Sequence, residues 1–278
     1  MLRPKTLKLI GVLCVLLCLC VGAARASPVF GIHGLREWSA ALQGDPSAPG
    51  VIRPVLADDF QLLVREEQAW PEEYQTAKFF TPHLYVEEHM DSHEHMEPAL
   101  VMQWGDQGAT GQDDPQPGDR VAAAWDFIYN EDPPFDQTNM LEFSIHAPWP
   151  CMFVSVNMFD GQGNYREWIW HVGDPDRNPD DEGKIPFCTW TTVQVNPVTL
   201  WSNYKYETVF THGAGFELST IQYIRFNENG VWSQEYQDPT TGLVWNAWNH
   251  VEVQPEPGTM LLLGGGLLAL VARRRRKR

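Results

Sequence analysis

The amino-acid sequence predicts an all-β protein built as an antiparallel β-sandwich, with a jelly roll as the expected topology and long polar loops. Three observations lead to this fold class. Segments of about 5 to 9 residues, rich in aromatic and β-branched side chains, recur from Val121 onward; clusters of turn-forming residues separate them; and no long amphipathic helical pattern interrupts them. Only the run REWSAAL, which begins at Arg36, indicates a helix.

Alternation of apolar and polar residues identifies the individual strands. In VAAAWDFIY, which begins at Val121, every second residue from the valine onward is expected on one buried face, and LEFSIH alternates in the same way. The segments CMFVSVNMF and REWIWHV flank the turn sequence DGQGN and together predict a β-hairpin. Further strands are expected at TWTTVQV, IQYIRF and WNAWNHVEV.

Residues 1–26 have the pattern of a secretory signal peptide. Basic residues precede an apolar run, and Ala24-Arg25-Ala26 places small residues where a signal peptidase cuts. Three of the five cysteines lie in this apolar run and leave with it. The remaining domain is expected over 27–253, in which 121–253 form the main sandwich and 27–120 either complete it or form a separate β-rich part.

The C-terminal residues 255–278 combine the motif Pro255-Glu256-Pro257, an uncharged apolar stretch and a cluster of six cations. The apolar stretch, within 258–272, predicts a short transmembrane segment whose basic end faces the cytoplasm. This order of parts resembles the PEP-CTERM sorting signal. The resemblance implies an exosortase as processing partner, a tail held in the inner membrane before cleavage, and export from a Gram-negative cell to its surface or to an extracellular matrix of exopolysaccharide and biofilm. A permanent tail anchor is the alternative.

The chain between the two terminal signals is strongly acidic. Residues 27–257 contain all 36 acidic residues but only 10 of the 20 lysines and arginines, which leaves a net charge of about −26. Such a surface excludes nucleic acid as a partner and favours cations, Ca²⁺ in particular. Cys151 and Cys188 are the two cysteines that remain, and in an exported protein they predict one disulfide, with two buried thiols as the alternative.

Two polar segments are candidate metal sites. The segment HMDSHEHME offers imidazoles and a carboxylate for Zn²⁺ or another transition ion, or is simply an exposed polar loop; its candidate ligands are His89, His93, His95 and Glu97. The segment DPDRNPDDEGK resembles the Ca²⁺ loops of EF-hands and thrombospondin-type repeats, although Pro179 stands where an EF-hand needs glycine; a solvated acidic loop is the alternative. Its candidate ligands are Asp174, Asp176, Asn178, Asp180 and Glu182.

The 12 tryptophans supply both core and candidate binding residues. Trp125, Trp168 and Trp170 fall on apolar faces and are expected in the interior. Three others stand among asparagine, glutamine and glycine, which suits stacking on sugar rings with amide hydrogen bonds; these candidate glycan-binding residues are Trp232, Trp245 and Trp248. Residues 121–253 also resemble the galactose-binding-like jelly rolls of carbohydrate-binding modules, through AAWDFIY, LEFSI, MFVSVNMFDGQGNYREWIW and FELSTIQYIRFNENGVW.

The sequence therefore predicts a non-enzymatic, exported protein with a structural or adhesive role, one that binds exopolysaccharide and Ca²⁺. It contains no G-x-S-x-G motif and no phosphate-binding loop, so no catalytic residue is assigned. A matrix-modifying, metal-dependent hydrolase that uses the histidine segment is the alternative.

Overall fold

The structure is a computed structural model, which describes residues 30–59, 78–104, 119–129, 139–147, 153–176, 178–213, 215–231 and 244–255. The expected signal peptide (1–26) and apolar tail segment (258–272) lie outside these ranges. Within them, no helix is long and apolar enough to cross a membrane.

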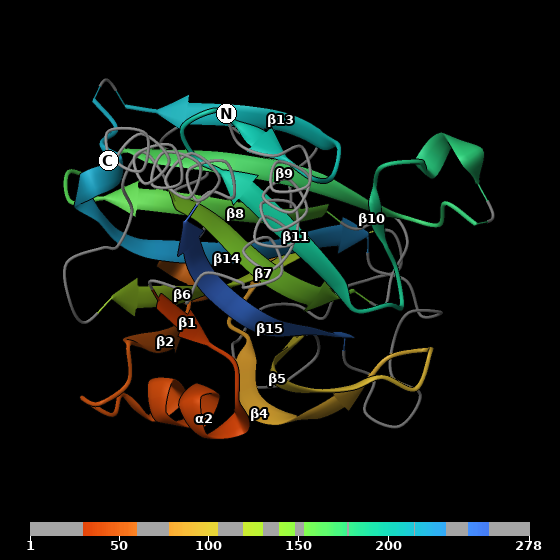
Figure 1. Cartoon of the computed structure of the whole chain (residues 1–278), viewed down its shortest axis with the longest axis horizontal. Helices are drawn as coiled ribbons and strands as arrows, with labels where there is room; N and C mark the ends of the chain where they lie inside the picture. Colours follow the sequence, from red (N-terminus) through yellow and green to blue (C-terminus); the bar gives the residue numbers. More distant parts are fainter. Residues whose placement is uncertain are drawn as a thin grey trace, which may run out of the picture.

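Strands of the described residues form two sheets that pack face to face (Figure 1). Sheet I has seven strands, in the spatial order β12 (Trp201–Ser202), β11 (Thr191–Asn196), β7 (Asn139–His146), β15 (Val244–Pro255), β5 (Met96–Trp104) and β4 (His83–Met90), with β1 (Phe30–Ile32) also paired to β15.

Sheet II has eight strands in the described ranges. Its spatial order is β10 (Ile185–Pro186), β9 (Tyr165–Gly173), β8 (Phe153–Asp160), β14 (Ile221–Val231), β6 (Arg120–Tyr129) and β2 (Gly50–Pro54), with β13 (Tyr206–His212) paired to β9 and β3 (Lys78–Phe80) paired to β6. The pairs β10–β9 and β3–β6 are parallel, and the other described pairs are antiparallel.

The chain passes repeatedly from one sheet to the other, from β5 to β6, β6 to β7, β7 to β8 and again from β14 to β15. Neighbours in each sheet are therefore often distant in sequence, as in jelly-roll sandwiches. The predicted all-β, antiparallel sandwich is confirmed. The expected hairpin is confirmed too, since β8 and β9 pair across the turn from Phe159 to Tyr165.

Between the sheets lies an aromatic core that follows the predicted alternation. Trp125 of β6 stacks on Phe226 of β14 with ring centroids 4.3 Å apart, and it meets Trp248 of β15 edge-on at 5.8 Å. Trp168 and Trp170 of β9 are also fully buried, as expected. Burial of this many large rings supplies most of the hydrophobic stabilisation of the sandwich.

The predicted helix is α2 (Leu35–Gln43), which contacts β2, β4 and β5 at one end of the sandwich (Figure 1). The Glu37 carboxylate accepts a hydrogen bond from the His33 N–H at 2.8 Å, which satisfies a donor just before the first turn. Gly44 ends the helix in the left-handed conformation, φ 71°. Two short 3₁₀ turns, η1 (Pro179–Asp181) and η2 (Leu218–Thr220), lie in connections.

Strands that precede Val121 belong to both sheets. β1 pairs with β15, β2 and β3 pair with β6, and β5 pairs with β15, so residues before and after this point share the same ladders. We therefore propose that residues 30–255 fold as one unit, with the N-terminal part completing the sandwich.

Candidate functional site: the outer face of sheet I

One face of sheet I points away from the core and collects polar and aromatic side chains. Strand alternation places Leu100 and Met102 of β5 in the core, whereas Ala99 and Val101 point outward and join Ala247 of β15 in a small apolar floor. The partly buried side chains of Tyr85, Trp190 and Trp245 pack on this floor. Small residues in the sheet thus leave room for large rings above it.

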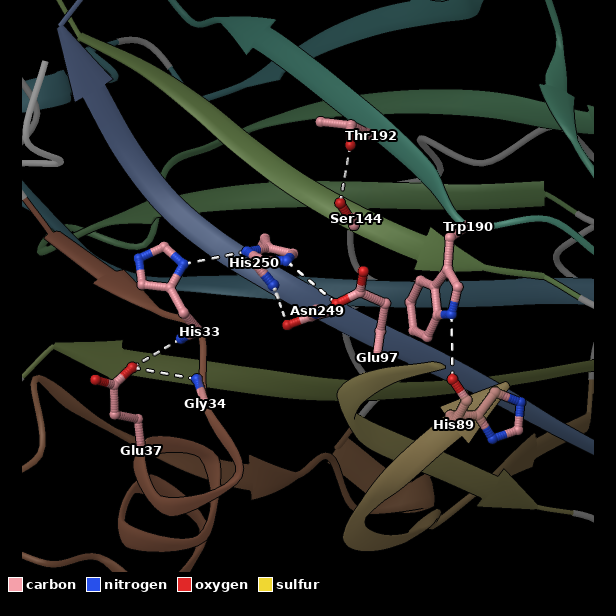
Figure 2. A network of polar contacts seen from close by, with 10 residues as sticks. All are labelled: His33, Gly34, Glu37, His89, Glu97, Ser144, Trp190, Thr192, Asn249 and His250. Carbon is pink, nitrogen blue, oxygen red and sulfur yellow. Dashed lines mark hydrogen bonds and ion pairs between the residues drawn. The ribbon is translucent and has the colours of Figure 1, made fainter. Parts of the chain in front are cut away.

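Four rings from separate segments meet on this outer face, and we call them the aromatic patch: His89 of β4, His146 of β7, Trp190 just before β11 and Trp245 of β15. The imidazole of His146 stacks on the indole of Trp245 with centroids 5.2 Å apart and 8° between the ring planes. His89 approaches the same indole at 4.3 Å, and Trp190 lies 5.6 Å from His146. Trp190 Nε1 donates a hydrogen bond to the His89 carbonyl at 3.3 Å (Figure 2). Both indoles remain partly exposed.

His146 is the buried member of the patch, with 4% of its surface exposed. Burial, and after it the neighbouring His89, lower the pKa of its imidazole from 6.5 to about 4, although the Asp91 carboxylate acts in the opposite direction. Neither ring nitrogen makes a hydrogen bond of normal geometry to another protein group. At neutral pH His146 is therefore uncharged, and its imidazole packs as an aromatic ring within the patch.

A row of carboxylate and amide side chains continues across the same face. Glu142 of β7 accepts hydrogen bonds from Gln194 Nε2 at 2.6 Å and from Gln254 Nε2 at 3.3 Å. Glu97 of β5 accepts from Asn249 Nδ2 at 3.1 Å (Figure 2). The strands of sheet I contain several glutamates but no lysine or arginine. Glu97, Gln194 and Gln254 are partly exposed, whereas Glu142 and Asn249 are buried, so the open part of this row consists of one carboxylate and two amides.

A β-bulge in β15 brings two histidines into this row. The register of β15 against β7 shifts between Asn249 and Glu252, and His250 within the bulge has a positive φ of 50°. Bulges commonly redirect a side chain. Here the His250 ring lies with Nδ1 3.2 Å from Nδ1 of His33, and its Nε2 lies 3.6 Å from the Glu97 carboxylate (Figure 2).

The structure does not bring the predicted transition-metal ligands together. His89 and Glu97 face outward from β4 and β5, where His89 joins the aromatic patch and Glu97 contacts Asn249 and His250. His93 and His95 lie instead in the exposed turn between the two strands. Among the described residues, no three histidine, cysteine, aspartate or glutamate side chains gather closely enough to hold a metal ion.

The predicted calcium ligands are likewise spread along a loop that is held by other contacts. Asn178 Oδ1 accepts from the Asp180 N–H at 3.2 Å, which caps η1. The buried acid of the loop is Asp181, which was not among the predicted ligands; it accepts from the Asp174 N–H at 2.9 Å and from Lys184 Nζ at 2.6 Å. The described residues of this segment therefore form a hydrogen-bonded loop, and their carboxylates do not form a cluster that could hold a metal ion.

The three predicted glycan-binding tryptophans have different positions. Trp245 lies on the outer face of sheet I, but Trp248 is fully buried against Phe226 and Phe143 in the core, so its prediction was wrong. The odd spacing of these two residues within one strand already implies opposite faces. Trp232 lies outside the described residues. Cys151 also lies outside them, so the disulfide between Cys151 and Cys188 stays a prediction. Burial raises the pKa of the Cys188 thiol.

Sequence reasoning missed Trp190 and His146 as members of a shared surface. Each comes from a different segment, and no local pattern in the sequence connects them. Only the pairing of β11 with β7 and of β7 with β15 brings them beside Trp245.

Comparison with family models identifies the sorting signal. Residues 255–277 match the family model of the PEP-CTERM protein-sorting motif. No curated protein matches the chain.

Several solved structures match the chain at low identity and low TM-score. An exo-β-agarase is 12% identical, with a TM-score of 0.40, over 64% of this chain and 22% of its own. The enzymatically active domain of tailspike protein 4 from bacteriophage CBA120 is 10% identical, with a TM-score of 0.34. The match covers 78% of this chain and 21% of the tailspike chain. A family 11 carbohydrate-binding module from Clostridium thermocellum, in complex with a β-1,3-1,4-mixed-linked tetrasaccharide, is 7% identical, with a TM-score of 0.35. The match covers 76% of this chain and 98% of the module. At these scores the likeness carries no argument about a site. The chain is thus a β-sandwich protein that carries a PEP-CTERM protein-sorting motif at its C-terminal end.

Proposed function

We propose that this protein is exported and sorted by an exosortase to the cell surface or extracellular matrix, where its sandwich binds a neutral polysaccharide on the outer face of sheet I. The observation that carries the proposal is the meeting of two partly exposed indoles, Trp190 and Trp245, with a row of carboxylate and amide groups. Flat apolar rings stack on the faces of sugar rings, and oxygen and amide groups bind their hydroxyls.

Trp201 extends the same surface at the edge of the sheet. It is 47% exposed, and it lies opposite Asn196 in the pairing of β12 with β11. Because Gln194 precedes Asn196 by two residues, all three belong to the outward set of positions. Aromatic rings on β15, just before β11 and on β12 suit an extended chain of sugars better than a single monosaccharide.

The charge of the face indicates the class of polysaccharide. Glu97 and Glu142 supply negative charge, and the strands of sheet I supply no lysine or arginine to balance it. A uronic-acid or sulfated polymer would be repelled, whereas a neutral polymer meets only hydrogen-bonding groups.

Affinity electrophoresis of the full chain in gels that contain a neutral glucan or, separately, alginate tests the proposal. We expect retardation by the neutral polymer and none by alginate. Trp190→Ala and Trp245→Ala should each weaken binding about 10-fold, since buried aromatic anchors carry most of the binding energy in such sites. Tyr223→Ala is the matched control, because Tyr223 is a partly exposed ring on sheet II, stacked on Phe159.

Equal weakening by Tyr223→Ala, or no effect of the two tryptophan variants, would contradict the proposed face. A parallel viscosity assay follows the length of the polymer. Retention without chain shortening supports binding, and progressive shortening would favour the hydrolase alternative.

A further inference from the structure

Trp190 of the aromatic patch lies in the segment that crosses from sheet II to sheet I. β10 ends at Pro186, and the ladder of β11 with β7 begins with the pair of Thr191 and Ile145, so Trp190 precedes that ladder. Cys188, also in the crossing segment, has a positive φ of 55°. The position of the Trp190 indole on the outer face of sheet I therefore depends on contacts other than strand pairing.

The hairpin of β4 and β5 supplies these contacts at its tip. Asp91 Oδ2 accepts a hydrogen bond from the Trp190 N–H at 3.2 Å. The carbonyl of His89 accepts a second one from Trp190 Nε1 at 3.3 Å (Figure 2). The tip also holds the crossing segment two residues earlier, because the Ser92 N–H donates to the Cys188 carbonyl at 3.1 Å. One hairpin thus binds both the backbone and the indole of the tryptophan.

The other oxygen of Asp91 fixes the carboxylate within the turn. Asp91 Oδ1 accepts from the His93 N–H at 2.8 Å and from the His95 N–H at 2.9 Å, and the side chain of Asp91 is fully buried. Burial alone would raise the pKa of this carboxyl, but the backbone donors and the nearby His95 lower it, so it is charged at neutral pH. A hydrogen bond from an N–H group to a charged carboxylate is stronger than one to a neutral acceptor.

We propose that Asp91 is a positioning residue of the polysaccharide site. Through its hydrogen bond to the Trp190 N–H, it holds the Trp190 indole in the aromatic patch, where the ring is available to stack on a sugar. Because its side chain is fully buried, Asp91 acts through the tryptophan and does not touch the polymer. This inference rests on the proposed function, since it assigns a role within the same site.

Asp160, in the turn between β8 and β9 of sheet II, offers a matched control. Its Oδ1 accepts from the Gln162 N–H at 2.8 Å and from the Asn164 N–H at 2.9 Å, the same pattern that Asp91 Oδ1 makes two and four residues on. Its Oδ2 accepts from Asn164 Nδ2 at 2.9 Å, within the turn, where Asp91 Oδ2 binds Trp190. Replacement of either aspartate by asparagine disturbs the same kind of turn, but only replacement of Asp91 removes a contact to the aromatic patch.

NMR spectra of the ¹⁵N-labelled full chain test the positioning without any ligand. Trp190→Phe identifies the indole N–H signal of Trp190 by its loss. We expect Asp91→Asn to shift this signal, because the two N–H groups of the turn occupy the single acceptor oxygen of asparagine and leave none for the Trp190 N–H. Asp160→Asn should leave the signal in place. A Trp190 signal that Asp91→Asn does not move would overturn the proposal.

Affinity electrophoresis in the neutral glucan then measures the consequence for binding. Asp91→Asn should weaken binding about 5-fold, less than Trp190→Ala, because the indole is displaced but not removed. Asp160→Asn should bind as the wild type does, and melting temperatures of the two asparagine variants show whether both remain folded.

A double-variant cycle separates positioning from an independent effect. In the Trp190→Ala background, Asp91→Asn should cause no further loss of binding, because both changes act on one contact. Additive losses, or wild-type binding by Asp91→Asn alone, would overturn the proposal. Wild-type binding by Trp190→Ala would instead contradict the proposed function, and the indole signal would still decide whether Asp91 positions the ring.

Discussion

At the scale of single residues, Glu228 is an acidic side chain buried in the core of the sandwich. It follows Phe226 by two positions in β14 and therefore faces the core, between Ala123 of β6 and Val154 of β8. It is fully buried, and neither carboxylate oxygen has a hydrogen-bond partner. Burial raises its pKa well above 4.5. Folding therefore requires this carboxyl to stay protonated.

We expect Glu228→Gln to stabilise the protein more at pH 8 than at pH 5. Because the folded-state pKa is raised, the native state binds more protons than the unfolded state above pH 4.5, and stability falls as the pH rises. Glutamine removes the ionisation while keeping the shape. Urea denaturation at both pH values measures the difference, with the exposed Glu182→Gln as control. A larger gain at pH 5 would contradict this account.

His146 has the opposite pH dependence. Its pKa is about 4 in the folded protein against an ordinary value of 6.5, so the unfolded chain binds the proton more tightly. Its contribution to stability is complete above about pH 6.5 and is lost as the pH falls toward 4. His146→Phe should flatten the decrease in the melting temperature between pH 6.5 and 4.5. The exposed His83→Phe should leave the decrease intact, and a wild-type protein with no decrease would disprove the assignment.

At the scale of elements, two hairpins use the same turn. Asp91 and Asp160 each accept hydrogen bonds from the N–H groups two and four residues later. Burial alone would raise the pKa of both carboxyls, but these donors lower it. The residue three positions on is left-handed in both turns, Glu94 at φ 63° and Gly163 at φ 83°. The sequences DSHEH and DGQGN thus encode one geometry.

The paired turns allow a matched comparison. Gly163→Ala should lower the free energy of unfolding by about 1 kcal/mol, because the left-handed conformation strains a residue with a Cβ. No heavy atom lies within 4 Å of the added Cβ, so strain is the only cost. Glu94→Ala replaces one strained residue by another and should change stability by less than about 0.5 kcal/mol. Chemical denaturation of both variants measures this, and equal effects would contradict a shared turn.

At the scale of the whole molecule, the C-terminal motif and the sandwich have separate roles. The match of residues 255–277 to the sorting motif begins at the last residue of β15, so cleavage near it would leave both sheets intact. We expect the intact mass of the protein from its natural producer to lack the basic tail. Substitution of Pro255, Glu256 and Pro257 by alanine should retain it. A natural product that still contains Arg278 would contradict sorting cleavage.

Much of the fold could be predicted because β-strands leave a local pattern. Period-two alternation identified β6, β7 and β8 and the core positions of Trp125, Trp168 and Trp170. One wrong prediction concerns Trp248, because polar neighbours in the sequence do not indicate that a strand residue is exposed. Burial in a strand depends on which face a residue occupies, and its immediate neighbours occupy the other face.

The sequence by itself determined the class of fold, the acidic character and the C-terminal sorting motif, because each depends on composition or on contiguous residues. The tertiary structure decided which side chains share a surface. His89, His146, Trp190 and Trp245 meet only through ladders between strands that are distant in the chain. Pairing between strands depends on residues that are far apart in the sequence, and no local pattern specifies which strand pairs with which.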